Sequence, residues 1–517
     1  GTIPSSLGNL SILHDLDLHA NLLTGPIPST LGNMTALEYL FLFSNGLTST
    51  IPPALGNLTN LIGFYVYNNL LTGTLPDSLA RLSNLQTFDV NNNSLHGHFP
   101  SFWSQMTQLS DLSLYYNQFS GSIAESFVSL TKLTFLEIYG NKLTGPIPTD
   151  FGQLQSLQYM ELSRNYLTGS LPASIVQLSL LQTLQVNNNL LTGSVPGTLG
   201  VALPQLTDLL MHDNLLHGSI PSSISSLSLL IELFLQNNRF TGSITHMINP
   251  LTQLHLETVQ LSGNQLSGVI PDALYALPSL TTLAAVSNCF QTTLSEAICT
   301  CTSLSTLALD GLQSASSCQQ TILPGVSKSY LVARPARGGI PLCLFEMHSL
   351  RTLHLSGNGI SGSLPSSVNV SRSLIDLALS HNSLTGTIPD SIQVREWYNL
   401  DLSYNRLSGS VDKSFAASQS LYIHYAESEN ITDPQSAVSV SLENNRLSGR
   451  IPHVLQVARN VSILGSNLFA CDVQQTNLPA HDAGADNYTC GSDGFNFPYY
   501  FWMAAVGVCC LILLVLW

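Results

Sequence analysis

Hydrophobic and polar positions along this chain follow a pattern that returns every 24 residues. Each copy alternates leucines with polar residues, then places an asparagine, and then adds further leucine or isoleucine. The asparagines that keep this step are Asn21, Asn45, Asn69, Asn93, Asn117, Asn141, Asn165 and Asn189. The rhythm continues with slips of one or two residues through Asn288, and resumes at Asn358 with a further break before Asn445 and Asn467. Such a period predicts an array of stacked repeats, because each repeat can bury its apolar side only against its neighbours.

The residues before each asparagine predict a short β-strand. Leu40 and Leu42, for example, occupy alternate positions, so both point to a buried face while their neighbours point to the other face. The asparagine amide can bond main-chain groups where the chain turns off the strand. We therefore expect one strand per repeat, with neighbouring strands about 4.8 Å apart in a parallel sheet.

The complete pattern, L-x-x-L-x-L-x-x-N-x-L-[TS]-G-x-I-P-x-x-[LF]-x-x-L, resembles the plant-type leucine-rich repeat. Its "GxIP" element is present at Gly145–Pro148 and Gly218–Pro221, and the resemblance covers roughly residues 1–490. That family includes receptor-like kinases, receptor-like proteins and secreted inhibitors of pectin-degrading enzymes. The resemblance implies an α/β-type repeat solenoid, a leucine-rich repeat superhelix with a concave parallel β-sheet and an irregular or 3-10 convex side. It also implies a second layer of strands at the "GxIP" segments.

Departures from the rhythm divide the chain into predicted parts. These are regular 24-residue repeats over 1–310, degenerate cysteine-containing repeats or a loop over 311–345, repeats with an insertion at about 411–436 over 346–467, a cysteine-containing C-terminal cap and juxtamembrane segment over 468–496, and one transmembrane helix over 497–517. A cap is expected because the last repeat would otherwise expose its apolar edge.

The gap from Asn288 to Asn358 has the length of three repeats, since the leucine pattern places Leu312 and Arg334 where two asparagines should stand. We therefore expect two degenerate repeats here rather than a large inserted domain. The same region carries a local basic patch formed by Lys328, Arg334 and Arg337. The patch is interpreted either as a ligand-contact loop or as a solvated irregular loop.

Charged residues make up only 9% of the chain, against roughly 25% in an ordinary soluble domain. Acidic residues outnumber Lys and Arg by 31 to 16, which gives a formal net charge of -15. A nucleic-acid partner would need a basic face, so the composition argues against this class of partner.

Eight Asn-x-Ser/Thr sequons, together with clustered cysteines that form no C-x-x-C pair, favour an oxidising lumen or the cell exterior. The glycosylation candidates are Asn9, Asn33, Asn57, Asn92, Asn369, Asn430, Asn460 and Asn487. The favoured disulfides in the degenerate region are Cys318–Cys343 and Cys289–Cys299, with Cys301 left over, although spacing alone leaves the pairing open. A Cys471–Cys490 bridge would resemble the C-terminal cap of the family.

The last 21 residues, 497–517, carry no charge and are long enough to span a hydrocarbon core of about 30 Å. Tyr499, Tyr500 and Trp502 would lie at the outer interface. A lipid-anchor signal and a buried core helix are the alternatives for this segment. The chain begins in mid-repeat, so we expect a fragment at its N-terminus. The predicted location is the cell membrane, with a single pass and an extracellular repeat array.

Side chains between the buried leucines of the predicted strands should face the concave surface. Aromatic and acidic residues gather there over several repeats, and such patches often mark binding surfaces. The predicted ligand-binding residues are Phe41, Phe43, Tyr65, Tyr67, Asp89, Tyr115, Glu137, Tyr139 and Glu161. This surface would suit a peptide with basic groups or a glycan that stacks on the rings. The alternative is that Tyr and Phe are present for strand propensity alone.

Glu137 and Glu161 would lie about one strand spacing apart, a distance that permits a catalytic carboxylate pair. An open concave sheet gives no water-excluding pocket, so we favour a solvated pair. The sequence contains no kinase, P-loop, zinc-protease or nucleophile-elbow motif. We therefore predict that this chain is not an enzyme and uses no cofactor or metal, while the full-length protein could carry a kinase.

The leading functional hypothesis is a membrane-anchored extracellular recognition or receptor-like protein. It would bind a peptide, protein or glycan on its concave face, and would signal through a partner such as a co-receptor or through a missing cytoplasmic part. The alternatives are a secreted or surface inhibitor of wall-degrading enzymes, an adhesive coat protein in which the array is a spacer, and, least favoured, a hydrolase.

Overall fold

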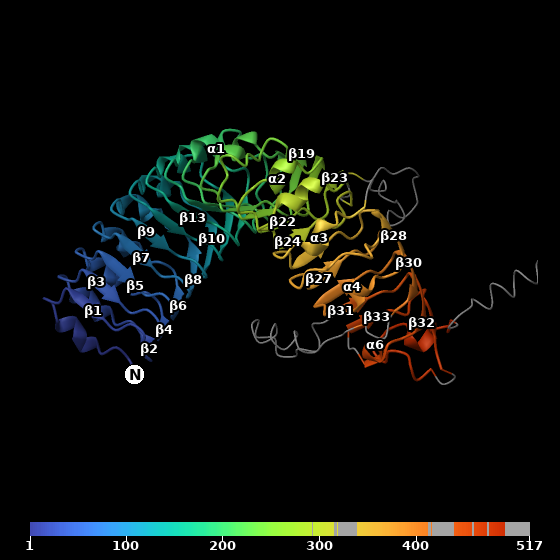
Figure 1. Cartoon of the computed structure of the whole chain (residues 1–517). Helices are drawn as coiled ribbons and strands as arrows, with labels where there is room; N and C mark the ends of the chain where they lie inside the picture. The colour runs from blue at the N-terminus through green and yellow to red at the C-terminus, as the bar shows by residue number, and fades with distance from the viewer. Residues whose placement is uncertain are drawn as a thin grey trace, which may run out of the picture. The chain divides into compact units, whose positions relative to one another are not determined.

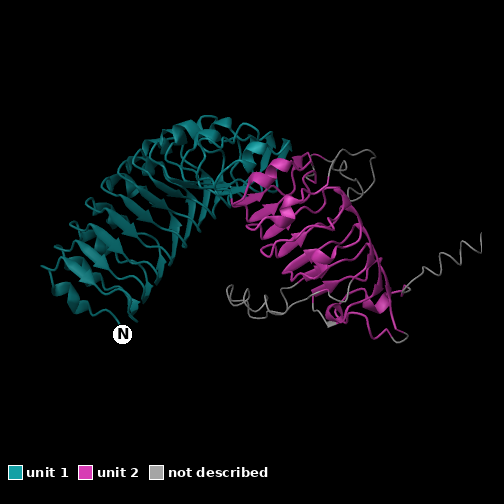
Figure 2. Cartoon of the chain, in the orientation of Figure 1, with its two compact units in different colours: residues 1–280 teal, residues 281–517 magenta. Residues whose placement is uncertain are grey.

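The computed structural model divides the chain into two compact units, unit 1 (Gly1–Leu280) and unit 2 (Thr281–Trp517), which Figure 2 shows in different colours. The described residues are 1–291, 293–314, 318, 339–411, 415, 439–457, 460–472 and 475–491. The calls that lie outside them are the basic patch of Lys328, Arg334 and Arg337, the sequon at Asn430, the segment 497–517, and most of the insertion at about 411–436.

The repeats contribute three-residue strands to an inner parallel sheet, as the leucine alternation predicts (Figure 1). In unit 1 these strands are β1 (Asp15–Asp17), β3 (Tyr39–Phe41), β5 (Gly63–Tyr65), β7 (Thr87–Asp89), β9 (Asp111–Ser113), β11 (Phe135–Glu137), β13 (Tyr159–Glu161), β15 (Thr183–Gln185), β16 (Asp208–Leu210), β18 (Glu232–Phe234) and β20 (Thr258–Gln260). In unit 2 they are β22 (Thr282–Ala284), β24 (Thr306–Ala308), β25 (Thr352–His354), β27 (Asp376–Ala378), β29 (Asn399–Asp401), β31 (Ser439–Ser441) and β33 (Asn460–Ser462).

Neighbouring inner strands pair in register one repeat apart. Leu16 lies beside Leu40, and Leu40 lies beside Phe64. The middle residue of a strand is buried, whereas the residues on either side of it keep part of their surface exposed, as in β3 and β7. The core is therefore a column of leucine and phenylalanine side chains behind the sheet, and the alternate side chains are free to form a surface.

A second layer of short strands follows the inner sheet, as the "GxIP" resemblance implies. In unit 1 these strands are β2 (Thr24–Pro26), β4 (Gly46–Ser49), β6 (Leu70–Gly73), β8 (Ser94–His98), β10 (Gln118–Ser122), β12 (Lys142–Pro146), β14 (Tyr166–Thr168), β17 (His217–Ser219), β19 (Arg239–Gly242) and β21 (Gln265–Gly268). In unit 2 they are β23 (Cys289–Phe290), β26 (Ser361–Ser363), β28 (Ser383–Gly386), β30 (Arg406–Ser410), β32 (Arg446–Arg450) and β34 (Leu468–Ala470). Gly145 in β12 has φ +75°, a conformation that glycine adopts without a Cβ clash.

Short helical turns close most of the described coils on the side opposite the inner sheet, which confirms the predicted 3-10 side (Figure 1). The 3-10 turns are η1 (Ser5–Asn9), η2 (Ser29–Asn33), η3 (Pro53–Asn57), η4 (Asp77–Arg81), η5 (Ser101–Gln105), η6 (Glu125–Ser129), η7 (Phe151–Gln153), η8 (Ala173–Gln177), η9 (Ser222–Ser226), η10 (Glu296–Thr300) and η13 (Ala485–Asn487). The α-helical turns are α1 (Leu199–Ala202), α2 (Asp272–Tyr275), α3 (Cys343–Glu346), α4 (Asp390–Gln393) and α6 (His453–Val457). Pro28 and Pro52 precede η2 and η3 with φ near -65°, and proline fixes this angle.

The asparagines form a continuous ladder of hydrogen bonds behind the sheet. The amide nitrogen of Asn69 donates to the carbonyl oxygens of Val66 in its own coil and Leu42 in the coil before it, both at 3.0 Å. Its Oδ1 accepts from the backbone N–H of Leu47 at 3.0 Å. One buried side chain thus pairs main-chain groups of two coils, which explains why asparagine recurs where each strand ends.

The predicted second degenerate repeat is absent from the inner sheet, and this prediction was wrong. Strand β24 pairs directly with β25, with Leu307 beside Leu353. Leu312 does stand in an asparagine position, since it is buried and its backbone N–H donates to Oδ1 of Asn358 at 2.8 Å. The ladder therefore closes directly between these two coils, and no position in it remains for Arg334.

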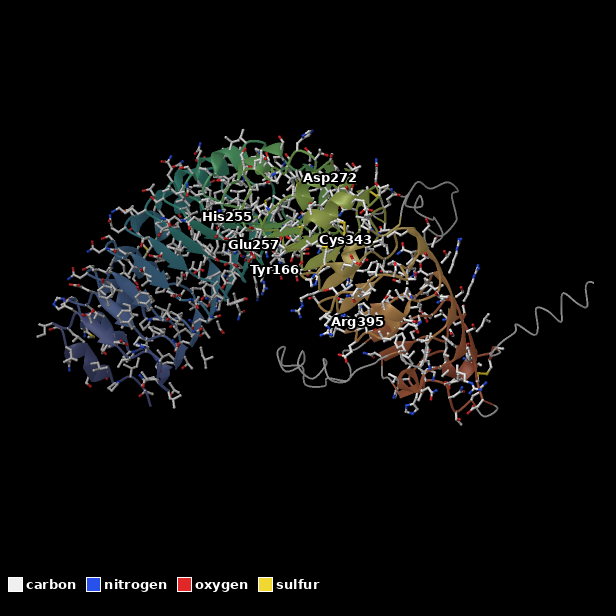
Figure 3. The ribbon with its side chains drawn as sticks, viewed as in Figure 1. Tyr166, His255, Glu257, Asp272, Cys343 and Arg395 are labelled. Atoms are coloured by element: carbon white, nitrogen blue, oxygen red, sulfur yellow. A yellow bond between two sulfur atoms is a disulfide. The ribbon has the colours of Figure 1, made fainter. Side chains whose placement is uncertain are left out.

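Two of the three predicted disulfides were also wrong. The structure joins Cys289 to Cys318 and Cys299 to Cys343, with Cα–Cα distances of 5.5 and 5.6 Å (Cys343 is labelled in Figure 3). Cys289 begins β23 while Cys299 lies in η10, so different parts of one coil carry them and each pairs with a different segment. The Cys471–Cys490 bridge is confirmed, and Cys301 is a buried thiol outside these bridges.

The sequons differ in their surroundings. Asn33 and Asn57 are exposed at the ends of η2 and η3, on the side opposite the inner sheet. The others that are exposed are Asn9, Asn369, Asn460 and Asn487. Asn92 is half-buried in the turn that follows β7, with φ +48°. Among the described residues, no helix has the length and apolar character that crossing a membrane requires.

Candidate ligand-binding face of unit 1

The solvent-facing side chains of the inner sheet in unit 1 form what we call the inner face. In each coil it is built from the first and third residues of the strand and from the residue two positions after the strand. In β3 these positions hold Tyr39, Phe41 and Phe43, while Leu40 and Leu42 between them are fully buried. All nine predicted ligand-binding residues lie on this face and all are half-buried.

Rings from the first coils stack along the inner face. This first aromatic cluster consists of His19, Tyr39, Phe41, Phe43, Tyr65 and Tyr67. The ring of Phe43 lies between those of His19 and Tyr67, with both centroids 4.4 Å away and nearly parallel planes. Phe41 stacks on Tyr65 at 4.9 Å. Strand pairing one repeat apart produces these contacts, because it puts equivalent side chains side by side.

Gly63 provides the space that this cluster needs. A Cβ at this position would lie 2.6 Å from Cε2 of Tyr65 and 2.9 Å from Cδ1 of Tyr39. Both distances are well below a van der Waals contact, so any larger residue would displace the two rings. Gly63, the first residue of β5, therefore contributes to the inner face by leaving room for the rings of Tyr39 and Tyr65.

A second aromatic cluster consists of Tyr115, Tyr116 and Tyr139. Tyr115 and Tyr139 stack at 4.5 Å, and Tyr116 meets Tyr139 edge-on at 5.1 Å. The hydroxyl of Tyr116 accepts a hydrogen bond from Nη1 of Arg164 at 3.1 Å. Arg164 lies two coils further along, and Gly140 stands between them, where a Cβ would come within 2.5 Å of the Tyr116 ring. The glycine thus allows the arginine to reach the tyrosine.

Asp89 and Asn91 lie between the two clusters. Oδ1 of Asp89 accepts from Nδ2 of Asn91 at 2.6 Å and from the backbone N–H of Asn91 at 3.2 Å. Burial raises the pKa of the Asp89 carboxyl to about 7, and the charge of Glu137 adds to this effect against the hydrogen bonds from Asn91. Asn91 itself is only 3% exposed, and within the described residues its Oδ1 accepts no hydrogen bond.

Glu137 and Glu161 are partners in the pairing of β11 with β13. Oε2 of Glu137 accepts from Oγ of Ser113 on the strand before it, at 2.7 Å. Glu161 accepts from the hydroxyl of Tyr159 at 3.0 Å and from Oγ of Ser163 at 3.1 Å. Burial raises the pKa of Glu161. The two carboxylates therefore accept hydrogen bonds from different coils.

The charges of this region are not balanced by nearby cations. Among the described residues, Asp89, Glu137 and Glu161 take part in no ion pair. Burial, together with the charges of Asp89 and Glu137, raises the pKa of Tyr115 to about 12. Burial also raises the pKa of Tyr139, and the charges of Glu161 and Glu137 add to this effect. The inner face is therefore negative where its second aromatic cluster lies.

Several residues of this face were missed from the sequence. Tyr159 and Tyr39 occupy the first position of their strands, and this position faces solvent like the third position. The alternation of buried and exposed residues, followed two positions back from the third strand residue, would have identified both tyrosines. Ser113 and Asn91 carry polar groups that bind the acidic residues, but nothing in their own pattern indicated this.

A separate polar cluster lies on the inner sheet of unit 2, also unpredicted. Nε2 of His354 lies 2.8 Å from Oδ1 of Asp376, and its Nδ1 lies 3.7 Å from Oδ2 of Asp310. Nδ2 of Asn399 donates to the same Oδ1 of Asp376 at 2.9 Å. The hydrogen bond to Asp376 raises the pKa of His354. The three repeats that carry the histidine and the two carboxylates are adjacent because β24 pairs directly with β25.

Comparison with protein families identifies the repeats. The family described as "Leucine rich repeat" matches residues 83–143 in one form, and in a second form residues 36–58, 156–178, 255–277, 349–370 and 373–394. No curated protein sequence matches the chain.

Solved structures match almost the whole chain. The ectodomain of the Arabidopsis receptor kinase HAESA, in complex with an extended IDA peptide hormone ligand, is 31% identical with TM-score 0.76, over 93% of this chain and 76% of that one. HAESA in complex with IDA and the co-receptor SERK1 gives 27% identity and TM-score 0.70, over 92% of this chain and 83% of that one.

The ectodomain of the membrane receptor kinase GASSHO1/SCHENGEN3 from Arabidopsis thaliana also matches, in complex with CASPARIAN STRIP INTEGRITY FACTOR 2. It is 29% identical with TM-score 0.73 over 92% of this chain. The match covers 56% of that ectodomain, so this chain spans little more than half of its length.

Proposed function

Because the chain belongs to the leucine-rich repeat family, with repeats like those of plant receptor-kinase ectodomains, we propose that it is an extracellular recognition protein that binds a peptide on the inner face of unit 1. The observation that carries this proposal is the gathering of stacked rings and unpaired carboxylates on one solvent-facing surface between β1 and β13. Half-buried aromatic side chains in such groups commonly provide the main anchors of a binding surface.

A peptide fits this surface better than a glycan does. A sugar would stack on the open face of a ring, but both faces of Phe43 are covered by His19 and Tyr67. Tyr115 and Tyr139 likewise cover one face of each other. The hydroxyls, ring edges and carboxylates that remain suit the polar and charged groups of a peptide. The peptide complexes of HAESA give independent support to this choice.

Anchoring and signalling form the second part of the proposal. The apolar segment 497–517 would hold the chain in the cell membrane, with the repeats outside. Signalling would pass through a partner, and the HAESA complex that contains the co-receptor SERK1 is the precedent for such a partner. Localisation of the full-length protein tests this part; retention in the cytosol would contradict it.

Peptide selection against the purified full chain tests the binding proposal. Peptides from a random display library would be measured for affinity with the wild type and with Tyr67→Ala and Tyr139→Ala variants. Each substitution should weaken binding by about fivefold or more, because it removes a ring from a cluster. Tyr166→Ala is the matched control, since Tyr166 is 56% exposed on the second strand layer and lies off the inner face (Figure 3).

Two outcomes would contradict the proposal. One is that no selected peptide binds the folded chain. The other is that peptides bind but keep their affinity in both inner-face variants while losing it in Tyr166→Ala. The first outcome would favour the alternative of a coat protein in which the array is a spacer. Binding of a secreted wall-degrading enzyme, with loss of that enzyme's activity, would favour the inhibitor alternative.

A further inference from the structure

We propose that the inner face of unit 1 contains a subsite for an arginine side chain of the peptide ligand, seated over Ser113 between Asp89 and Glu137 and against the ring of Tyr115. This inference rests on the proposed function and specifies the chemistry of the ligand at one position. It also predicts an order of preference, arginine over lysine over any neutral side chain.

The subsite begins with a gap between two carboxylates. Strands β7, β9 and β11 are neighbours, with Asp89 beside Ser113 and Ser113 beside Glu137. Two strand spacings of about 4.8 Å therefore separate the backbones that carry the carboxylates. Serine is the smallest side chain in this row from Asp17 to Gln185. Its Oγ donates to Oε2 of Glu137 at 2.7 Å, so the Glu137 carboxylate leans toward Ser113 and faces Asp89 across it. The charge of Glu137 contributes to the raised pKa of Asp89, in keeping with their proximity.

An aromatic wall stands beside this gap. Tyr115 follows Ser113 by two residues and lies on the same face, with Tyr139 stacked on one side of its ring at 4.5 Å. Asn91 lies on the other side, one coil earlier. Because both sides of the Tyr115 ring are covered, its edge is what remains beside Ser113. A guanidinium group is planar, so it can lie against this ring edge while its fixed fork of N–H donors bonds to carboxylates. An ammonium group has a single charge centre and no such plane, hence the expected preference for arginine.

Two features of the free protein show that this site lacks a partner. Asp89, Glu137 and Glu161 are half-buried and take part in none of the ion pairs of the described residues. Charges that lose water without gaining a counter-charge weaken the folded state. Asn91 is 3% exposed, and its Oδ1 accepts no hydrogen bond within the described residues. A guanidinium group brings the positive charge that the three carboxylates lack and an N–H donor for Oδ1 of Asn91.

The cation that fits here is organic and not a metal ion. No group of three His, Cys, Asp or Glu side chains in the described part of the chain is arranged to hold a metal. The nearby Arg164 does not fill the gap, since its Nη1 donates to the hydroxyl of Tyr116. The charge of Arg164 does lower the pKa of Glu161, but this is the smallest of the effects that act on that carboxyl. A basic side chain from outside the chain is therefore the complement of this site.

Titration calorimetry of the full chain with hexa-arginine, hexa-lysine and hexa-citrulline tests the subsite. Citrulline keeps the shape of arginine without its charge. We expect hexa-arginine to bind several-fold more tightly than hexa-lysine and hexa-citrulline not to bind. The double variant Asp89→Asn/Glu137→Gln should lose at least about tenfold in hexa-arginine affinity.

The matched control is the double variant Asp208→Asn/Glu232→Gln. These acids also lie on the inner sheet, where they are direct partners on β16 and β18, and the change removes one aspartate and one glutamate charge as in the test variant. Equal loss of affinity in both double variants would mean attraction by net charge alone and would overturn the subsite, as would the absence of hexa-arginine binding. Thermal unfolding of each variant confirms that it is folded.

The same variants separate failure of the subsite from failure of the proposed function. One outcome is that the selected peptides carry no basic residues, require Tyr67 and Tyr139, and bind the Asp89→Asn/Glu137→Gln variant as well as the wild type. This outcome would uphold peptide recognition and overturn the arginine subsite. Selected peptides enriched in arginine, with affinity lost in that variant, support both.

Discussion

Nδ2 of Asn91 donates a hydrogen bond to Oδ1 of Asp89 at 2.6 Å, so the carboxylate between the two aromatic clusters is held by an amide and not by a cation. Burial outweighs this hydrogen bond, since the pKa of Asp89 is raised to about 7. The inner face thus retains a carboxylate whose ionised form is disfavoured in the free protein.

Replacing Asp89 by asparagine should stabilise the protein at high pH. A carboxyl whose pKa is raised on folding contributes stability that is present below about pH 4 and is lost as the pH rises to about 7. Asp89→Asn removes this loss, so the variant should gain about 1–3 kcal/mol at pH 8 and little at pH 4. The unfolding midpoint, measured at both pH values, reports the change. An effect that is the same at both would contradict the raised pKa.

Binding of hexa-arginine should strengthen as the pH rises from 5.5 to 8. The guanidinium group binds the ionised form of Asp89, and the pKa of about 7 means that this form is the minority below neutrality. Calorimetry across this range measures the effect. In Asp89→Asn the residual binding should lose most of its pH dependence over the same range, and retention of the full dependence would assign it to another group.

Gly63→Ala should disturb the first aromatic cluster. The added Cβ would lie 2.6 Å from Tyr65 and 2.9 Å from Tyr39, so the rings must move and the stacking of Phe41 on Tyr65 should change. We expect a cost of about 1–2 kcal/mol and an altered near-ultraviolet circular dichroism spectrum. Gly197→Ala is the control, because nothing lies within 4 Å of a Cβ there.

Removal of a ladder asparagine should be costly in the middle of the array and cheap at its start. Asn141 is 6% exposed, donates to the carbonyl oxygens of Leu114 and Ile138, and accepts from the N–H of Phe119. Asn141→Ala leaves these buried groups unpaired and should cost about 2–4 kcal/mol. Asn21 is exposed and donates only within its own coil, so Asn21→Ala should cost well below 1 kcal/mol. Similar shifts in unfolding midpoint would refute the ladder's role.

Unit 2 should lose stability as the pH rises through the pKa of His354. Its hydrogen bond to Asp376 raises this pKa above the ordinary 6.5, so the contribution is fully present below 6.5 and is lost above the raised value. Asp310 and Asp401 add to the effect, and burial opposes it. Nuclear magnetic resonance titration of the imidazole measures the pKa directly, and a value below 6.5 would contradict the structure. His354→Gln should remove this part of the pH dependence.

The repeat fold could be predicted because its determinants are local. Each coil repeats one set of contacts, so the spacing of Leu40, Leu42 and Asn45 carries the strand, the core and the ladder together. The direction of the inner-face side chains followed from the same alternation. The predicted residues therefore lie on one surface, although their role in binding stays a prediction.

The remaining features depend on contacts that spacing does not contain. The pairing of Cys299 with Cys343 depends on which segments meet outside the sheet, and many pairings suit the same sequence. The expected coil at Arg334 was wrong because a segment of suitable length need not enter the sheet. The cluster of His354, Asp310 and Asp376 arises only when β24 and β25 are known to be neighbours.

The ladder also has a consequence for how such a protein changes over evolutionary time. Asn69 and its equivalents pair the main chain from behind the sheet, so these main-chain hydrogen bonds do not depend on the identity of the solvent-facing residues. Mutations there can alter affinity without first endangering the scaffold. Deleting the coil that carries β7 would bring Tyr67 next to Tyr115 and remove Asp89, while the core positions on either side would meet equivalent positions of another coil. Specificity in this architecture can therefore diverge by recombination of complete modules as well as by single substitutions.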